Sequence, residues 1–220
     1  LTDVTGVQTC ALPILNKNAK FPARFFLVTF IFSWVIWGPL VLGSLKIIPV
    51  SEKILSVIRF PVIFLGAFGP LAAALLDLRH AEGKGSAKKF LQSFFDFRLG
   101  FKAYFLPILI FGGSTFFAWF MPELFGYERL PMLLPSIWVL IPCLIFMILL
   151  GGGQEEFGWR GYALPVLERK FGIWYANIFL GVIWSLWHIP TCFITGTTQS
   201  YMNFGGFVIL RSEEHTSELQ

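Results

Sequence analysis

The stretch GGGQEEFGWR, residues 151–160, decides how the rest of the chain is interpreted. It places two adjacent glutamates and an arginine within sequence that is otherwise strongly apolar. A second stretch, WSLWHIP at residues 184–190, places a histidine in another apolar run. A charged side chain in the middle of a bilayer costs roughly 2.5–3.5 kcal/mol on insertion scales, and such residues are usually kept for catalysis or ion transport. These two stretches are therefore predicted to form the functional site of a membrane protein.

The composition supports a membrane location. Of the 220 residues, 55% are hydrophobic and only 14% are charged. A soluble domain carries about a quarter charged residues, so this chain has too few to cover a surface that faces water. The net charge of +4 does not indicate nucleic-acid binding, because the positive residues cluster between apolar runs, as membrane topology requires. The sequence predicts an integral membrane protein.

Apolar runs divide the chain into candidate spans. About 20 residues are needed to cross the hydrocarbon core as a helix, and the sequence predicts an all-α, polytopic transmembrane helical bundle with five full spans plus a truncated sixth. The full spans are expected at about 25–45, 58–78, 101–121, from 133 into the glycines at 151, and 173–194, and the truncated one at 201–210. The second span carries small residues that would let a neighbouring helix approach closely: Gly66, Gly69, Pro70 and Ala72–Ala74.

The two ends of the chain differ in character from the sequence between them. Residues 1–14 (LTDVTGVQTCALPI) lack the basic start and continuous apolar core of a signal peptide. Residues 211–220 (RSEEHTSELQ) interrupt an apolar run with a charged and polar segment. We expect both to be non-native tails of a single transmembrane domain at residues 15–210, and we expect that domain to be a fragment.

The distribution of lysine and arginine predicts the orientation of the spans. With the N-terminus on the inner side, twelve of these residues before position 211 fall on that side and four on the other. Positive residues concentrate in cytoplasmic loops. We therefore expect a cytoplasmic N-terminus, in the inner (cytoplasmic) membrane of a bacterium.

Sequence spacing places the acidic stretch and the histidine at a similar depth. If the fourth and fifth spans form an antiparallel pair that turns near Lys170, Glu155 lies 15 residues before the turn and His188 lies 18 after it. At about 1.5 Å per residue, each lies roughly 22–27 Å along its helix from the turn. The two groups are therefore expected at matching positions on neighbouring helices, as a shared site requires.

The spacing within each stretch indicates how the polar side chains group. Glu156 and Arg160 are four residues apart and can pair on one helix face. Trp184 and His188 have the same spacing. A partly desolvated carboxylate can act as a general base toward water, and an imidazole can bind a metal, donate a hydrogen bond or stabilise an oxyanion. The alternatives are a structural charge cluster at a helix end and a packing histidine bonded to a backbone carbonyl.

The two motifs resemble those of a known family. EEFGWR at 155–160, followed by WSLWH at 184–188, is similar to the Glu-Glu-x-x-x-Arg and aromatic-x-x-x-His motifs of the CPBP family of intramembrane proteases. GPLAA at 69–73 also resembles an earlier helix of that family. The family includes the CAAX prenyl endopeptidases and the bacteriocin-processing or bacteriocin-immunity membrane proteins.

The resemblance implies a role for each polar residue of the two motifs. Glu155 would activate the attacking water, and Glu156 and Arg160 would support it. His188 would be a second catalytic group or a metal ligand. The chemistry would use either zinc or another divalent metal, with His188 and Glu155 as ligands, or glutamate and histidine alone.

A third family motif, a histidine followed by an asparagine or aspartate on a later helix, has no counterpart in this sequence. The only later histidine is His215, in the polar tail. We therefore expect that the chain is truncated before the third motif and that it is inactive as given.

Three functions follow from these observations. The first is an intramembrane endopeptidase that hydrolyses a peptide bond of a prenylated or leader-bearing peptide with a glutamate-activated water. The second is a non-enzymatic bacteriocin-immunity or scaffold membrane protein of the same fold. The third, ranked last because the first three spans carry few charges, is a proton-coupled transporter. The expected partners are a peptide substrate, lipidated in the CAAX case, and membrane lipid; no nucleic acid and no particular oligomeric state is indicated.

Two further expectations concern residues outside the motifs. Asp77 is expected to be an ordinary charge at the end of a span. Several tryptophans are expected to be anchors at the membrane–water interface: Trp34, Trp37, Trp119, Trp138 and Trp174.

Overall fold

Every regular element in the computed structural model is a helix, over the four ranges that it describes: 21–94, 101–128, 137–149 and 152–201. The all-α class is therefore confirmed for these residues. The predicted tails at 1–14 and 211–220 lie outside them, as does all of the predicted sixth span except Tyr201.

Contacts among the helices divide the chain into two units. One unit consists of residues 1–90 and 146–220, and it holds both predicted motifs. The other consists of residues 91–145. It contains α5 (Phe101–Leu124) and most of α6 (Ile137–Leu149), whose last residues belong to the first unit.

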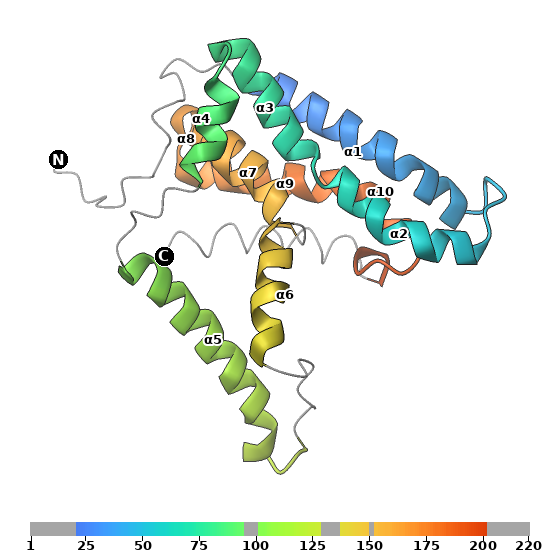
Figure 1. Ribbon diagram of the computed structural model, residues 1–220, viewed down its shortest axis with the longest axis vertical. Coiled ribbons are helices and arrows are strands. Elements are labelled where there is room, and N and C mark those ends of the chain that lie inside the picture. The colour runs from blue at the N-terminus through green and yellow to red at the C-terminus, as the bar shows by residue number, and fades with distance from the viewer. Residues whose placement is uncertain (1–20, 95–100, 129–136, 150–151, 202–220) are drawn as a thin grey trace. The chain divides into compact units, whose positions relative to one another are not determined.

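Three helices form the framework of the first unit: α1 (Ala23–Ser44), α2 (Glu52–Gly66) and α3 (Gly69–Glu82). Helix α1 packs against α2 and α3, which return alongside it in the opposite direction (Figure 1). Within the described residues, α1 and the stretch from α2 through α3 are long and apolar enough to cross a membrane. Helix α9 (Ile173–Trp187) is apolar but shorter. These helices support an integral membrane protein, and the first two match the predicted first and second spans. Helix α9 begins where the predicted fifth span begins but ends at Trp187, before the predicted end at residue 194.

Pro70 explains why the second span consists of two helices rather than one. Proline has no N–H, so it cannot donate to the carbonyl of Gly66, four residues earlier in the chain. The hydroxyl of Ser33 in α1 donates to this carbonyl instead, at 2.7 Å. The neighbouring helix thus supplies the hydrogen bond that the broken helix lacks.

Glycines bring three helices of the first unit into close contact. A Cβ on Gly69 would overlap the hydroxyl of Ser33 in α1. On the other side of α3, a Cβ on Gly158, the last residue of α7 (Gly153–Gly158), would overlap the backbone of Pro70. The predicted close approach at the small residues of the second span is therefore confirmed at Gly69 and Pro70.

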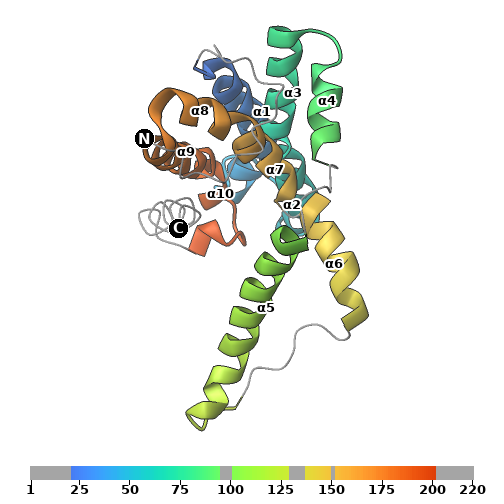
Figure 2. The same cartoon turned by 90° about the vertical axis from the view of Figure 1, so that its left-hand side faces the viewer.

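The other described helices of the first unit pack on this framework or on one another (Figure 2). Helices α7 and η1 lie on α3, α10 lies on α1, and α8 packs against α9. The chain turns between α8 and α9 at Gly172, close to the turn predicted near Lys170. The bounds not yet given are α4 (Ser86–Ser93), π-helical η1 (Trp159–Ala163), α8 (Leu164–Phe171), α10 (Ile189–Cys192) and the 3₁₀ turn η2 (Gln199–Tyr201).

Tryptophan rings fill the centre of the first unit. Trp37, Trp159 and Trp187 are each at most 1% exposed, and the rings of Trp37 and Trp187 lie 4.8 Å apart between centroids. The interpretation of Trp37 as an interface anchor is therefore wrong. Its side chain is buried because it packs between α1 and α2, where its indole N–H donates to the carbonyl of Ile63 at 3.0 Å.

Candidate active site

A hydrogen bond joins the two predicted motifs. Glu155 lies in the first turn of α7, and the indole N–H of Trp184 in α9 donates to its Oε2 atom at 3.0 Å. Trp184 is 3% exposed, so its surroundings fix the direction of this donor. The acidic stretch and the aromatic-histidine stretch therefore lie side by side at this pair, and the predicted depth match of Glu155 with His188 stays a prediction.

The second glutamate pairs with the arginine of the same motif. Arg160 forms an ion pair with Glu156, four residues earlier, across the junction of α7 and η1. The guanidinium also lies over the ring of Trp184, 5.2 Å from its centroid. The predicted pairing of Glu156 with Arg160 is confirmed, and the arginine links it to α9.

The two adjacent carboxylates therefore have different partners. Glu156 faces a positive charge, whereas Glu155 receives a hydrogen bond from a neutral indole. Adjacent acids in unlike surroundings can take different protonation roles, as catalytic carboxylate pairs commonly do. The arrangement suits Glu155 as a base and Glu156 as a charge that holds Arg160 in place.

His188 lies at the break between α9 and α10 and is 7% exposed. Its Nδ1 atom is 2.9 Å from the carbonyl oxygen of Trp184. A carbonyl only accepts, so Nδ1 carries the proton, and the lone pair of the neutral ring is on Nε2. This bond is the one expected of a packing histidine. Histidines that bind metals also commonly donate their second ring nitrogen to a backbone carbonyl.

The break at His188 is stabilised by neighbouring polar groups. Pro190 interrupts the helical hydrogen bonding, and the hydroxyl of Thr191 donates to the carbonyl of His188 at 2.7 Å. The carbonyl of Trp187 accepts from the indole N–H of Trp34 in α1 at 3.0 Å. These bonds hold the histidine at a fixed position at the end of α9.

A π-helical turn, η1, carries Arg160. Such turns insert one residue into an α-helix and are frequent at functional sites. The phenol of Tyr162 in this turn donates to Oδ2 of Asp77 in α3 at 2.6 Å. Sequence reasoning missed this contact and described Asp77 as an ordinary charge at a span end. An acidic residue one turn before the end of an apolar helix was the only signal available.

The described residues do not form a complete metal site. Within the ranges that the structure covers, no group of three or more His, Cys, Asp or Glu side chains could hold an ion. A catalytic zinc has three protein ligands and an open position. Glu155 and His188 would supply two of the three protein ligands, which is one fewer than a catalytic zinc needs.

The geometry defines a class of protein: a helical membrane protein with two glutamates, an arginine and a histidine gathered from two neighbouring parts of the chain. Comparison with known proteins then gives the family. Residues 136–212 match the model of the Rce1-like type II CAAX prenyl endopeptidases. Over this segment the chain is similar to the CAAX proteases, the family that the two motifs resemble.

A curated relative agrees with the family match. "CAAX prenyl protease 2" of Methanococcus maripaludis is 42% identical over 55 residues. The aligned part is 25% of this chain and 20% of the relative. The chain therefore matches about a fifth of the length of that protein.

Proposed function

We propose that the protein is an intramembrane endopeptidase in which Glu155 activates a water molecule for attack on a peptide carbonyl. One observation carries the proposal: the carboxylate of Glu155 is held by Trp184 beside a glutamate that is already paired with Arg160. The site thus contains two adjacent acids, one hydrogen-bonded to an indole and the other in an ion pair, and the proposal assigns the proton transfer to the first.

The reaction needs a base, a stabilised oxyanion and an acid for the leaving amine. Glu155 takes a proton from water, and the oxygen of that water bonds to the carbonyl carbon. The same carboxyl group then returns the proton to the amide nitrogen as the C–N bond breaks. Nδ1 of His188 is bonded to the carbonyl of Trp184, so the proposal assigns the second ring nitrogen, Nε2, to the reaction. In its protonated form the ring would donate from Nε2 to the oxyanion.

The alternative for the whole protein is chemistry with zinc or another divalent metal, with Glu155 and His188 among its ligands. When bound, such an ion would polarise the substrate carbonyl and acidify water. The steps given above use the side chains of this chain alone.

We propose a prenylated peptide as the substrate. The support is the family match and the name of the aligned relative, which is a CAAX prenyl protease. A leader-bearing peptide, as processed in other branches of the family, is the alternative substrate. A non-enzymatic immunity or scaffold protein would bind a peptide without cleaving it.

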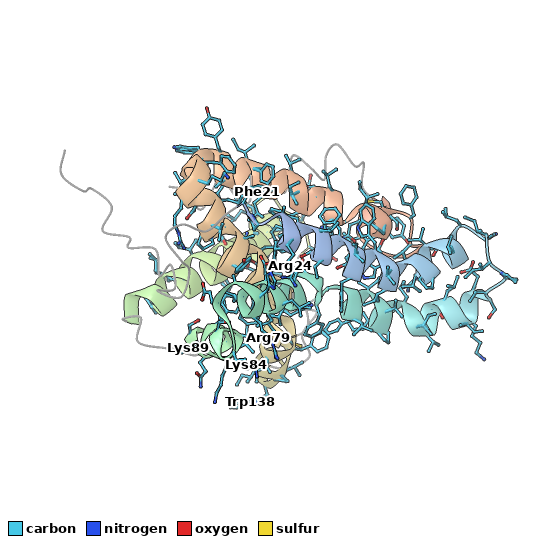
Figure 3. The ribbon with its side chains drawn as sticks, turned by 90° about the horizontal axis from the view of Figure 1, so that it is seen from above. Phe21, Arg24, Arg79, Lys84, Lys89 and Trp138 are labelled. Carbon is cyan, nitrogen blue, oxygen red and sulfur yellow. The ribbon has the colours of Figure 1, made fainter. Side chains whose placement is uncertain are left out.

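We also propose that the N-terminus is cytoplasmic and that the protein lies in the cytoplasmic membrane of its cell. Figure 3 shows Arg24, Arg79, Lys84 and Lys89 toward the end of the first unit that is remote from the loop between α1 and α2. The basic end of a membrane bundle usually faces the cytoplasm. Cysteine labelling at the two ends of α1 in intact cells would test the orientation.

Cleavage in proteoliposomes tests the function. The native protein is reconstituted with a fluorogenic farnesylated peptide and, in parallel, with the same peptide lacking the lipid. We expect cleavage of the farnesylated peptide only, and loss of cleavage but not of binding in Glu155→Gln. Normal turnover by Glu155→Gln would show that Glu155 is not the base. Binding without cleavage by the wild type would support the immunity or scaffold function.

A further inference from the structure

Arg59 is a charged residue within a segment that is otherwise suited to a membrane. It lies in α2, seven residues after the first residue of that helix and roughly 10 Å along its axis. The stretch from α2 through α3 is long and apolar enough to cross a membrane. Charged side chains in such segments are costly and usually pair with one another or with backbone carbonyls. The proposed chemistry does not use Arg59, so its contacts indicate a separate role.

The guanidinium of Arg59 holds the chain that follows the second motif. Its Nη1 atom donates to the carbonyl of Thr195 at 2.7 Å, across 136 positions of sequence. The N–H of Thr195 donates to the hydroxyl of Ser44, the last residue of α1, at 3.3 Å. Both backbone polar groups of Thr195 are therefore bonded to the pair of helices formed by α1 and α2.

Hydrogen bonds hold this junction, because packing does not fill it. A cavity of about 30 Å³ remains there, and Ser44, Arg59 and Thr195 are among the residues that line it. The next residue, Gly196, has a φ of 82°, a conformation that other residues rarely adopt. A Cβ on Gly196 would overlap the guanidinium of Arg59. The arginine therefore occupies the space that a side chain at position 196 would take.

Short hydrogen bonds connect Thr195 to the histidine of the second motif. The backbone N–H groups of Thr191, Ile194 and Thr197 each donate to the carbonyl three residues earlier. The hydroxyl of Thr197 donates to the carbonyl of Thr191, and the hydroxyl of Thr191 donates to the carbonyl of His188, both at 2.7 Å. Both threonines are buried. Residues 188–197 thus form one hydrogen-bonded segment, so a shift at Thr195 is passed to His188.

We propose that Arg59 is a positioning residue that, through Thr195, fixes the 188–197 segment and with it the location of His188. The inference rests on the proposed function for the catalytic effect, whereas the hold on the segment does not require catalysis. Without the guanidinium, Thr195 keeps only its bond to Ser44. The indole of Trp34 still holds the carbonyl of Trp187 before the segment, so the segment loosens at its far end without detaching.

Arg59→Met tests this inference, because methionine keeps an apolar stem and removes the donor. We expect kcat for the farnesylated peptide in proteoliposomes to fall about tenfold with KM nearly unchanged, since a small displacement of a reacting group slows catalysis and the substrate is not touched. A purely structural role would lower the yield of folded protein and leave kcat per folded molecule unchanged. Lys53→Met removes an exposed charge from the same helix, and its kcat should equal that of the wild type.

Gly196→Ala reaches the same contact from the other side. Its methyl group would displace the guanidinium, so this variant should reproduce the loss of kcat seen in Arg59→Met. In the double variant, the second substitution should cost much less than it does alone, because the bond to Thr195 is already absent. Losses of kcat that multiply fully in the double variant would overturn the assignment to Arg59.

Hydrogen exchange of residues 188–197, measured by mass spectrometry, gives a readout that does not depend on activity. Exchange should be faster in Arg59→Met and in Gly196→Ala than in Lys53→Met, because the turns of the segment open more often. Unchanged exchange in both variants would overturn the hold on the segment, whatever the activity. Absence of cleavage by the wild type, together with faster exchange in the two variants, would refute the proposed function and support the hold by Arg59.

Discussion

The phenol of Tyr162 donates a hydrogen bond to the carboxylate of Asp77 at 2.6 Å, and this bond ties the π-helical turn to α3. Arg160 belongs to the same turn and pairs with Glu156. The position of the arginine therefore depends on a bond that forms two residues further along the chain.

Replacement of Tyr162 by phenylalanine should destabilise the protein by about 1–3 kcal/mol, because a partly buried carboxylate loses its donor. Denaturant unfolding in detergent micelles would measure the loss. Tyr175→Phe is the control, since that side chain is 74% exposed at the start of α9. Equal stability of the two variants would show that the Asp77 bond contributes nothing.

Alanine at position 158 should be destabilising although alanine favours helices. Its methyl group would overlap the backbone of Pro70, which cannot move without shifting α3. Overpacking of this kind costs about 1–3 kcal/mol. Gly113→Ala in α5 is the control, because a Cβ there meets nothing within 4 Å. Thermal unfolding should show a loss for position 158 and no loss for position 113.

The ion pair of Glu156 and Arg160 can be measured with a double-mutant cycle. Glu156→Gln and Arg160→Gln each leave one charge without its partner in a partly exposed setting. The double variant should therefore be about 1 kcal/mol more stable than the sum of the single effects predicts. Strict additivity would mean that the pair makes no net contribution to stability.

Ser33→Ala should lower the free energy of unfolding by weakening the break between α2 and α3. The carbonyl of Gly66 loses the donor that replaces the missing N–H of Pro70, and an unsatisfied buried carbonyl costs about 1–3 kcal/mol. Ser56→Ala removes a hydroxyl whose bond to Lys53 is exposed, and it should be nearly neutral. Comparison of the two unfolding curves separates the effect of the break from that of losing a serine.

Glu168 gives a prediction about pH. Burial raises the pKa of this carboxyl group above 4.5, while the hydrogen bond from Asn177 and the charge of Arg169 oppose the shift. A raised folded-state pKa means that stability from Glu168 is present below 4.5 and is lost as pH rises through the folded-state value. As pH rises above 4.5, the Tm of Glu168→Gln should therefore decrease less than the Tm of the wild type. An unchanged pH dependence of Tm would show that Glu168 does not contribute to it.

Local spacing in the sequence was sufficient to predict part of the site. The interval of four residues between Glu156 and Arg160 predicted an ion pair that the structure contains. Equal distances from the turn predicted that Glu155 and His188 lie at a similar depth, and the contact that the structure shows is between Glu155 and Trp184, four residues before His188. Both predictions depend only on helix geometry, which fixes neighbours along one helix and depth across an antiparallel pair.

Other features depend on partners that are remote in the sequence. The bond from Ser33 to Gly66 joins residues 33 positions apart, and the bond from Tyr162 to Asp77 joins residues 85 apart. The sequence around Asp77 does not indicate that Tyr162 is its hydrogen-bond donor. Trp37 was predicted to be an interface anchor from its residue type alone. Its side chain is buried because it packs between two helices, which the residue type does not indicate.

Helix α3 has no flexible side chain at two of the points where it meets its neighbours. Gly69 touches α1, and Pro70 touches Gly158 of α7. Helix α1 in turn presents an apolar face to its surroundings, with Leu27, Ile31 and Val35 each more than half exposed. Helices adjust their tilt to the thickness of the bilayer. We expect such a stiff set of contacts to transmit this tilting to α7, so the geometry around Glu155 should depend on the acyl-chain length of the host membrane.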